Sequence, residues 1–249
     1  MTQVVPLLEV DKVSRIFGGI VALKEVSFNV RADEVVGLIG PNGAGKTTLF
    51  NVISGLIPPS GGEIRLAGRS ITGARPDRIC ALGAVRTFQA ASLLSGMTVW
   101  DNVHVASLFR GESARQNVSP EECTRQALDL CELGHLKEAF VESLTIGDQK
   151  RAEIARAVAS DPKLMMTDEI LAGLNPADGE RILSILRKVR QRGISIIFVE
   201  HDVRSVMSLS DRVVVIAQGE KLAEGTPQQV ARSPDVIKVY LGGRYAQNL

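Results

Sequence analysis

The chain has 249 residues, 45% of them hydrophobic, so it is long enough to bury one substantial core. Its 29 basic and 28 acidic residues nearly cancel, which excludes a strong overall field for nucleic acid and requires any anion site to be local. Three cysteines, Cys80, Cys123 and Cys131, form no C-x-x-C pair, which argues against a disulfide framework or a zinc knuckle and indicates a reducing cytoplasm.

Alternating apolar and polar residues near the N-terminus predict strands at 8–13, 26–30 and 63–67. We expect them to form an antiparallel sheet. Phe17 lies between the first two strands, and its ring can either stack on a purine or pack against its neighbours. The residues alone leave both interpretations open.

An apolar run at 34–39 is followed by GPNGAGKTT and then by a helical pattern at 48–54. This sequence meets the pattern G-x-x-x-x-G-K-[ST] in a strand–loop–helix context, which predicts a phosphate-binding loop. Glycines let the backbone aim its N–H groups at phosphate, and a helix beginning near Lys46 adds its positive dipole end. We expect Lys46 to reach the β- and γ-phosphates and the Thr47 hydroxyl to bind Mg²⁺. The other loop residues expected to line the nucleotide are Gly40, Pro41, Asn42, Gly43, Ala44, Gly45 and Thr48.

The central part of the chain changes to a helical pattern between residues 90 and 161. Amphipathic runs at 121–133 and 147–159 predict its main helices. A short buried strand at 83–89 precedes this region and ends in Gln89, a residue that can also be a simple surface cap. The helical region is the expected second lobe.

Three apolar strands, at 163–169, 193–201 and 212–217, follow the helical region, and the last continues into a hairpin that turns at 218–220. A helix of period near 3.6 precedes the second of them, which indicates a parallel sheet covered on both faces. Ligands of such sheets bind at the carboxyl ends of the strands. The residues found at those ends are Asp168, Glu169 and His201.

These three residues suit phosphoryl chemistry beside a phosphate-binding loop. Asp168 ends an apolar strand, where a metal-binding acid belongs, because Mg²⁺ prefers hard oxygen ligands. Glu169 is placed to orient or deprotonate a water, and His201 to contact the γ-phosphate. Carboxylates at strand ends are usually solvated, and a lone histidine is more often structural, as we expect of His104 and His135. Beside the phosphate-binding loop, the solvated interpretation of Asp168 and Glu169 loses most of its weight.

Taken in chain order, these residues resemble the ATP-binding-cassette family over nearly the whole chain. The motifs that carry the resemblance are Phe17, the loop at 40–48, Gln89, LTIGDQ at 144–149, Asp168 with Glu169, GLNP at 173–176, and His201. A phosphate-binding loop alone leaves kinases, GTPases and helicases open, whereas this combination is typical of cassettes. The resemblance implies an α/β P-loop NTPase cassette with a parallel core sheet, an N-terminal antiparallel β subdomain and a helical lobe.

The resemblance also implies how the chain is divided and what its motifs do. One cassette domain would cover 1–249, with the nucleotide-binding core at 1–89 and 162–249 and a helical signature lobe at 90–161. Phe17 would be the adenine platform, and Gln89 would link Mg²⁺ and water to the transport pore. The signature residues, which would touch the γ-phosphate held by an opposing subunit, are Thr145, Gly147 and Asp148.

Further segments resemble the ATPase subunits of bacterial branched-chain amino acid importers. These are residues 15–23, 85–89, 97–103 and 234–242. The resemblance implies an Mg²⁺-dependent ATPase, a translocase that powers amino acid import. The alternatives are the ATPase of a lipid or lipopolysaccharide exporter, a non-transport cassette acting on DNA or ribosomes, and a P-loop kinase.

The partners implied are a second cassette, identical or cognate, membrane permease subunits and, indirectly, a periplasmic solute-binding protein, with no nucleic acid. Small and apolar residues at 90–103 suit burial against a permease helix or in the lobe's own core. No uninterrupted apolar stretch approaches the ~20 residues that cross a bilayer, and the N-terminus lacks a basic region followed by an apolar run. We therefore expect a cytoplasmic chain, peripheral on the inner face of the membrane.

The signature departs from the common cassette pattern, with LTIGD where LSGGQ is usual. Thr145 keeps a hydroxyl and Gly147 keeps the close backbone approach. Asp148 introduces a negative charge near polyphosphate, which is unfavourable unless it faces away or meets a cation, Lys150 or Arg151. Two further departures are Ile170, in place of Pro, and Asn175, in place of Asp.

Overall fold

The computed structural model describes residues 5–87, 93–110 and 118–241. The contacts divide the chain into two compact units, the first formed by Met1–Pro76 with Ser195–Leu249 and the second by Asp77–Ile194. Within the described residues, no helix combines the length and apolar character needed to span a bilayer.

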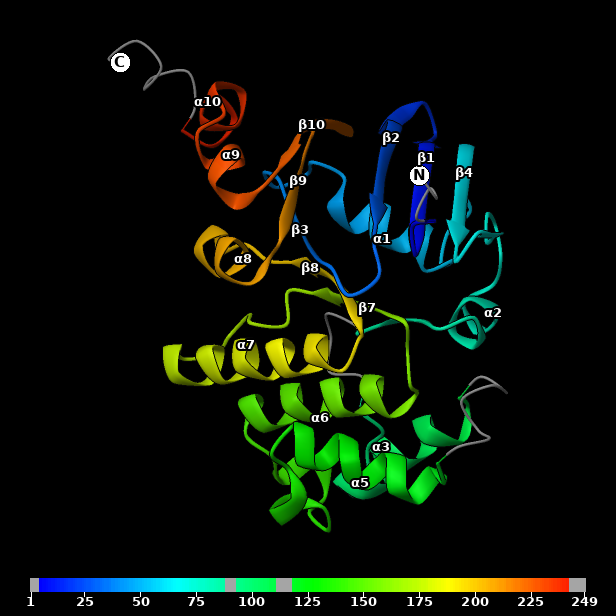
Figure 1. Cartoon of the computed structure of the whole chain (residues 1–249), viewed down its shortest axis with the longest axis vertical. Helices are drawn as coiled ribbons and strands as arrows, with labels where there is room; N and C mark the ends of the chain where they lie inside the picture. The colour runs from blue at the N-terminus through cyan, green and yellow to red at the C-terminus, as the bar shows by residue number, and fades with distance from the viewer. Residues whose placement is uncertain (1–4, 88–92, 111–117, 242–249) are drawn as a thin grey trace. The chain divides into compact units, whose positions relative to one another are not determined.

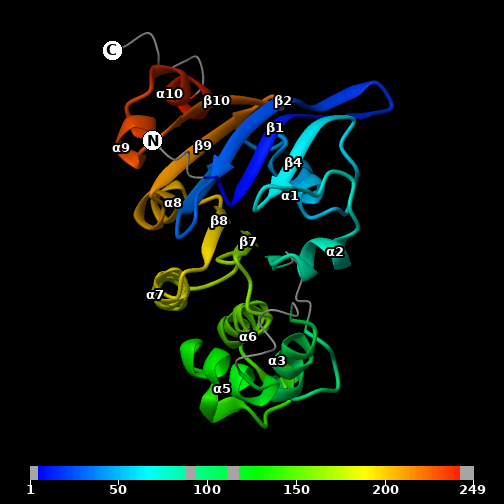
Figure 2. The same cartoon turned by 45° about the vertical axis from the view of Figure 1, so that its right-hand side comes forward.

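An antiparallel sheet opens the first unit, with the strand order β2-β1-β4-β5. Its strands are β1 (Leu8–Phe17), β2 (Ile20–Val30), β4 (Gly61–Leu66) and β5 (Arg69–Ser70). Figure 2 shows β2, β1 and β4 side by side. Gly18 and Gly19 join β1 to β2 with φ of 49° and 92°, a conformation in which glycine is not strained. The predicted strands at 8–13 and 26–30 are confirmed and extend as far as this turn, so Phe17 lies at the tip of a hairpin.

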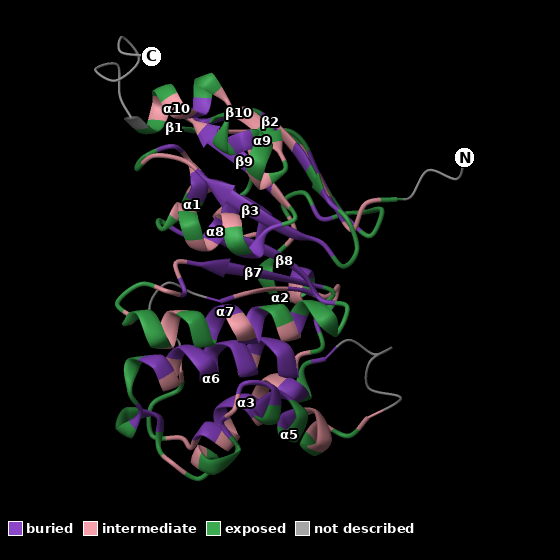
Figure 3. Ribbon diagram, turned by 60° about the vertical axis from the view of Figure 1, so that its left-hand side comes forward, coloured by how far each residue is buried: buried purple, intermediate pink, exposed green. Residues whose placement is uncertain are grey.

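A parallel sheet forms the core of the first unit. β3 (Val35–Ile39) pairs in parallel with β8 (Ser195–Val199) on one side and β9 (Arg212–Ala217) on the other. Every residue of β3 and β8 is buried (Figure 3), as expected of strands covered on both faces. β9 turns back into the antiparallel β10 (Glu220–Gly225), which confirms the predicted closing hairpin.

Helices pack against this core. They are α1 (Lys46–Ile53), α8 (Val203–Leu209), α9 (Pro227–Ala231) and α10 (Pro234–Leu241). α8 lies close to β3 at Gly37, where a Cβ atom would stand 2.3 Å from Cγ1 of Val206. Because glycine has no side chain, α8 can approach β3 closely at Gly37.

The second unit contains a pair of parallel strands and a set of helices. β6 (Ala84–Arg86) pairs with β7 (Leu164–Asp168). The helices are α2 (Pro76–Ala81), α3 (Val99–Leu108), α5 (Pro120–Leu130), α6 (Ile146–Ala159) and α7 (Pro176–Gln191), with short 3₁₀ turns η1 (Gly134–Leu136) and η2 (Val141–Ser143). α3, α5 and α6 pack on one another, and α7 runs along α6 (Figure 1).

α7 shows why these helices associate. Its buried residues recur every three or four positions and form one apolar stripe: Ile182, Leu183, Ile185, Leu186 and Val189. Asn175 caps its first turn, and Pro176 occupies the first helical position, where a missing N–H is tolerated. The helix predicted before the second apolar strand is confirmed.

The predicted helix at 121–133 is correct in type but ends early, at Leu130. Glu132 adopts a left-handed backbone conformation with φ of 58°, which breaks the helix. Ion pairs of its carboxylate with Arg181 and Lys188, both 2.7–2.8 Å long, accompany this conformation. Those partners lie far along the sequence, so helical periodicity alone placed the end three residues too late.

Candidate functional site

The phosphate-binding loop connects β3 to α1 in the first unit. Two of its glycines are enforced by close backbone neighbours, since a Cβ at Gly40 would stand 2.1 Å from the Ile216 oxygen and one at Gly45 2.7 Å from the Ala22 oxygen. Gly45 also has φ of 105°, a conformation that L side chains rarely adopt. The loop therefore has the conformation that only these glycines allow.

Backbone hydrogen bonds tie the loop to the turn between β9 and β10. The Gly219 N–H donates to the Ala44 oxygen at 3.0 Å, and the Lys24 N–H donates to the Gly219 oxygen at 2.8 Å. The turn thus links the loop to β2, the strand of the Phe17 hairpin. Segments distant in sequence hold the loop in place.

The N-terminus of α1 is arranged for an anion. Gly45 is the N-cap residue and makes no side-chain capping bond, and the first turn contains no acidic residue. By contrast, Thr145 caps α6 and Asn175 caps α7. The first amides and the positive dipole end of α1 therefore have no side-chain acceptor of the helix's own competing with a phosphate.

Lys46 lies over the loop with 7% of its surface exposed. Its ammonium donates to the Gly40 oxygen at 2.6 Å and the Pro41 oxygen at 3.0 Å. Thr47 follows it and is exposed. The ammonium group thus lies against the first two carbonyl groups of the loop, and Lys46 is itself the first residue of α1.

Phe17 is 40% exposed at the hairpin tip, which argues against a role in core packing. The guanidinium carbon of Arg15 lies 4.5 Å from the ring centroid, a cation–π contact. Arg15 also donates to the Pro58 oxygen at 2.9 Å. The ring thus carries a flat cationic group on one face.

His201 follows β8 by two residues and is exposed. Because Val199 is paired with Leu38 in a parallel register, the chain leaves β8 and β3 at the same edge of the sheet. That edge is the carboxyl end, where ligands of such sheets bind. The structure therefore brings His201 and the phosphate-binding loop to one edge of the first unit.

Asp168 and Glu169 lie in the second unit, at the end of β7. Asp168 is the last residue of the strand and is 2% exposed, and Glu169 follows with a left-handed φ of 52°. An Nη2 atom of Arg86 donates to Oδ2 of Asp168 at 2.8 Å. Arg86 is a site residue that sequence patterns did not identify, since nothing in its local spacing indicates a contact with residue 168.

Gln89 and the first part of the expected permease surface lie outside the described residues. Of the residues in that surface which are described, Leu94 is 43% exposed. Trp100 stacks on His104 with ring centroids 6.0 Å apart. His104 also lies 3.1 Å from the Thr124 hydroxyl, which agrees with the structural role expected of it.

The signature segment forms the N-terminus of α6, as expected. Thr145 caps the helix by accepting the Asp148 N–H at 3.1 Å, and its hydroxyl donates to Oδ2 of Asp148 at 2.8 Å. Arg151 makes an ion pair with the other carboxylate oxygen, Oδ1. Burial alone raises the pKa of Asp148, but the Thr145 and Arg151 hydrogen bonds outweigh it and hold that pKa below its usual range.

Arg151 is therefore the cation that neutralises Asp148. Its guanidinium is 4% exposed and also donates to the carbonyl oxygens of Cys131 at 3.0 Å and Glu132 at 2.7 Å, at the end of α5. The other candidate, Lys150, pairs instead with Glu153 at 3.5 Å. The unusual signature charge is thus compensated within the helical part of the second unit.

The N-termini of α6 and α7 meet at Gly147. A Cβ at this position would stand 2.9 Å from Cγ of Asp178, in the first turn of α7. The Asn175 side chain accepts the Asp178 N–H at 2.9 Å and donates to Oδ2 of Asp178 at 2.8 Å. An ionised Asp at position 175 has no N–H to donate, which gives a physical reason for the unusual asparagine.

A family model described as ABC transporter matches residues 23–172, and a second, described as Branched-chain amino acid ATP-binding cassette transporter, matches residues 220–246. The high-affinity branched-chain amino acid transport ATP-binding protein LivG of Salmonella typhimurium is 41% identical over 250 residues, 95% of this chain and 98% of that protein. BraF of Pseudomonas aeruginosa, which has the same description, is 41% identical over 252 residues, with the same coverage of both chains.

Solved structures agree with these matches. The ADP conformation of MJ1267, an ATP-binding cassette of an ABC transporter, has a TM-score of 0.86 and 30% identity, covering 96% of this chain and 99% of that one. A dimeric post-hydrolysis cassette, MJ0796 bound to ADP and Pi, has a TM-score of 0.77 and 26% identity over 88% and 98% of the two chains. The chain belongs to the ABC transporter family, as an ATP-binding cassette of the group that includes LivG and BraF.

Proposed function

We propose that this chain is the ATP-binding and ATP-hydrolysing subunit of an importer for branched-chain or related amino acids. The ATPase part depends on one observation, the uncapped N-terminus of α1 with the Lys46 ammonium beside it. The similarity to LivG and BraF and the match over residues 220–246 support the class of transported molecule. The lipid-exporter and non-transport alternatives find no support among these relatives.

The phosphate-binding loop would hold the triphosphate of ATP. Amides of 40–48 donate to phosphate oxygens, and Lys46 exchanges the carbonyl oxygens of Gly40 and Pro41 for the β- and γ-phosphates. Phe17 stacks on adenine, in the way that it now stacks on Arg15. These residues lie in one unit and are fixed by its backbone contacts, which favours a preformed site.

Thr47, Gln89 and Asp168 would hold Mg²⁺, which shields the charge of the phosphates when it is bound. Asp168 fits this role because its buried carboxylate, at the end of β7, offers hard oxygens. In the described residues, no three His, Cys, Asp or Glu side chains gather in a way that could hold a metal. Phosphate and water would therefore supply the remaining ligands.

The residues that would act on water are Glu169 and His201. Glu169 is half-buried and follows the metal-binding acid directly, so its carboxylate can take a proton from water near the γ-phosphate. His201 would hold that water against the phosphate.

Replacing Glu169 by Gln tests this assignment. The amide keeps the size of the side chain but cannot accept the proton, so ATP binding should persist while the rate of hydrolysis falls by about 10²–10⁴-fold. Glu180→Gln, on the exposed surface of α7, is the matched control and should hydrolyse ATP normally. Measuring whether phosphate is released free or appears on an acceptor also separates an ATPase from a kinase. A normal rate for Glu169→Gln would reject the assignment.

The signature segment would complete the site of a partner cassette. The N-terminus of a 14-residue helix favours an anion, and this segment contains Thr145, Gly147 and Asp148. The ion pair with Arg151 neutralises the negative charge of Asp148, which would otherwise repel a phosphate. We expect the Glu169→Gln variant to form a dimer when it is saturated with Mg–ATP, so light scattering should give twice the monomer mass. A monomer under these conditions, even with a cognate second cassette added, would contradict the proposal.

Membrane permease subunits and, beyond them, a periplasmic binding protein are the proposed partners, at the inner face of the membrane. ATP binding and hydrolysis would shift the permease between states through their different affinities for the associated cassettes. Residues 90–161 are proposed as the lobe that carries both the signature and the permease contact. Reconstitution with the co-purified permease should give ATP-dependent uptake of leucine, isoleucine or valine, and lipid movement without uptake would favour the exporter alternative.

A further inference from the structure

The pair formed by Arg86 and Asp168 is almost entirely shielded from water. The two side chains retain 7% and 1% of their exposed surface, and Nη2 of Arg86 lies 2.8 Å from Oδ2 of Asp168. A carboxylate buried to this degree needs a cation or several hydrogen bonds, because desolvation disfavours its charged form strongly. Arg86 is therefore the counter-charge of the Asp168 carboxylate inside the protein.

The strand register explains how the arginine arrives there. Arg86 is paired with Met166 in the parallel ladder of β6 and β7, and the Thr87 N–H extends it by donating to the Met166 oxygen at 2.9 Å. Asp168 is two residues beyond Met166, so the side chains of Arg86 and Asp168 project from the same face of the β6–β7 pair. A long arginine side chain reaches along that face to the carboxylate.

We propose that Arg86 occupies the cation position at Asp168 in the metal-free protein and leaves Oδ2 when Mg²⁺ arrives with ATP. This inference rests on the proposed role of Asp168 in metal binding. A guanidinium and a divalent ion at one carboxylate repel each other, and at short separation in a buried site that repulsion is large. Arg86 is thus a positioning residue that delays metal binding until nucleotide phosphates add their own negative charge.

Binding of Mn²⁺ alone to the nucleotide-free full-length protein tests the proposal. Arg86→Met leaves the Asp168 carboxylate without its counter-charge, so it should bind Mn²⁺ roughly tenfold or more tightly than wild type does, measured by loss of the free-Mn²⁺ electron paramagnetic resonance signal. The gain should disappear in the double variant Arg86→Met/Asp168→Asn. Arg86→Lys keeps a cation and should behave as wild type.

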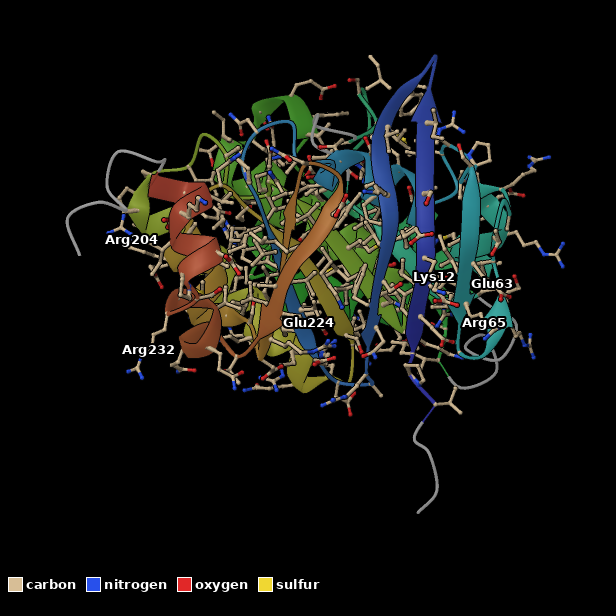
Figure 4. The ribbon with its side chains drawn as sticks, turned by 90° about the horizontal axis from the view of Figure 1, so that it is seen from above. Lys12, Glu63, Arg65, Arg204, Glu224 and Arg232 are labelled. Atoms are coloured by element: carbon tan, nitrogen blue, oxygen red, sulfur yellow. The ribbon has the colours of Figure 1, made fainter. Side chains whose placement is uncertain are left out.

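Arg65→Met is the matched control. It removes the same charge from an exposed ion pair with Glu63 on β4, where the two side chains point to solvent (Figure 4), and should leave Mn²⁺ binding unchanged. Equal Mn²⁺ affinity in wild type and Arg86→Met, or an equal gain in Arg86→Lys and Arg65→Met, would overturn the proposal.

A measurement on the wild-type protein covers the case in which Arg86→Met fails to fold. The side-chain ¹⁵N signals of Arg86, assigned from their absence in Arg86→Lys, should shift with Mg–ATP and stay in place with ATP and EDTA. Arg86 side-chain signals that do not shift when Mg²⁺ is added with ATP would reject the proposed exchange. Failure of the proposed function is distinct, because it would appear as Asp168→Asn binding Mn–ATP as tightly as wild type.

Discussion

Asp148 carries a charge that its own helix neutralises. The Thr145 hydroxyl and the Arg151 guanidinium each take one carboxylate oxygen, and Arg151 further binds two carbonyl groups at the end of α5. The buried Arg151 side chain therefore neutralises the signature residue Asp148 and also binds the end of the neighbouring helix α5. Its removal should affect both.

Arg151→Gln should lower the free energy of unfolding by about 3–5 kcal/mol, because it leaves a partly buried carboxylate and two carbonyl groups without their donor. It should also weaken ATP-driven association, since Asp148 then faces phosphate uncompensated. Chemical denaturation and light scattering measure the two effects. Adding Asp148→Asn should restore association but only part of the stability, and a double variant no better than Arg151→Gln in association would contradict this role.

The pair of cations at Glu132 gives a pH prediction. Hydrogen bonds from Lys188 and Arg181 lower the pKa of Glu132 from 4.5 to about 2. A carboxylate with a lowered folded-state pKa contributes stability that is fully present above 4.5 and is lost as the pH falls towards 2. Its side chain remains 36% exposed, so solvent screening limits the contribution to about 0.5–1 kcal/mol.

Glu132→Gln should therefore be less stable than wild type by that amount at neutral pH, and the difference should shrink between pH 4.5 and 2. Urea denaturation across this window measures it. Added salt should reduce the difference in the same way, because the ion pairs are partly exposed. A difference that stays constant over the whole window would show that the variant acts through packing.

Sequence patterns identified residues whose role depends on local spacing. Lys46 and Thr47 belong to an eight-position motif, and Arg151 lies three residues from Asp148 on one helix face, so both sets were within reach of the sequence. Arg86 and Asp168 are 82 positions apart, and only the register of two strands brings them together. Such contacts carry no signal in a single chain.

The N-terminal turns of α6 and α7 pack at a glycine, so two elements proposed to face a partner subunit are fixed to each other. Gly147→Ala should disturb both, since its Cβ would meet the Asp178 carboxylate at 2.9 Å and one of the helices must move. The expected result is a loss of ATP-driven association and about 1–3 kcal/mol of stability. Thermal unfolding and light scattering measure these.

Gly179→Ala is the matched control for that prediction. Gly179 lies within α7, and a Cβ atom added there would meet nothing within 4 Å. Alanine should therefore stabilise the helix by about 0.5–1 kcal/mol and leave association unchanged. If both glycine variants behave alike, close packing at Gly147 has no special importance.

Elements were predicted more reliably than their ends. Strong periodicity identified α7 and the apolar strands, whereas α5 stops at Leu130 because of the backbone conformation of Glu132. β1 and β2 continue to a two-glycine turn that their alternation did not reveal, since the last residues before the turn are exposed on both faces. Tertiary contacts and solvent exposure decide these boundaries.

At the scale of the whole molecule, the proposed site needs two cassettes, which predicts complementation between inactive chains. Lys46→Ala should not hold the triphosphate, and Gly147→Ala should fail as a partner. In a mixture, some dimers combine the intact loop of one chain with the intact signature of the other. ATPase activity should then reappear on mixing and grow with protein concentration. Two variants that stay inactive together would indicate that each chain works alone.

The bond between the Gly219 amide and the Ala44 oxygen joins the two ends of the chain's first unit. During translation, residue 219 emerges from the ribosome long after the loop at 40–48, so a nascent chain has the motif well before it has the contact that shapes it. An incomplete or prematurely terminated product should therefore bind little nucleotide.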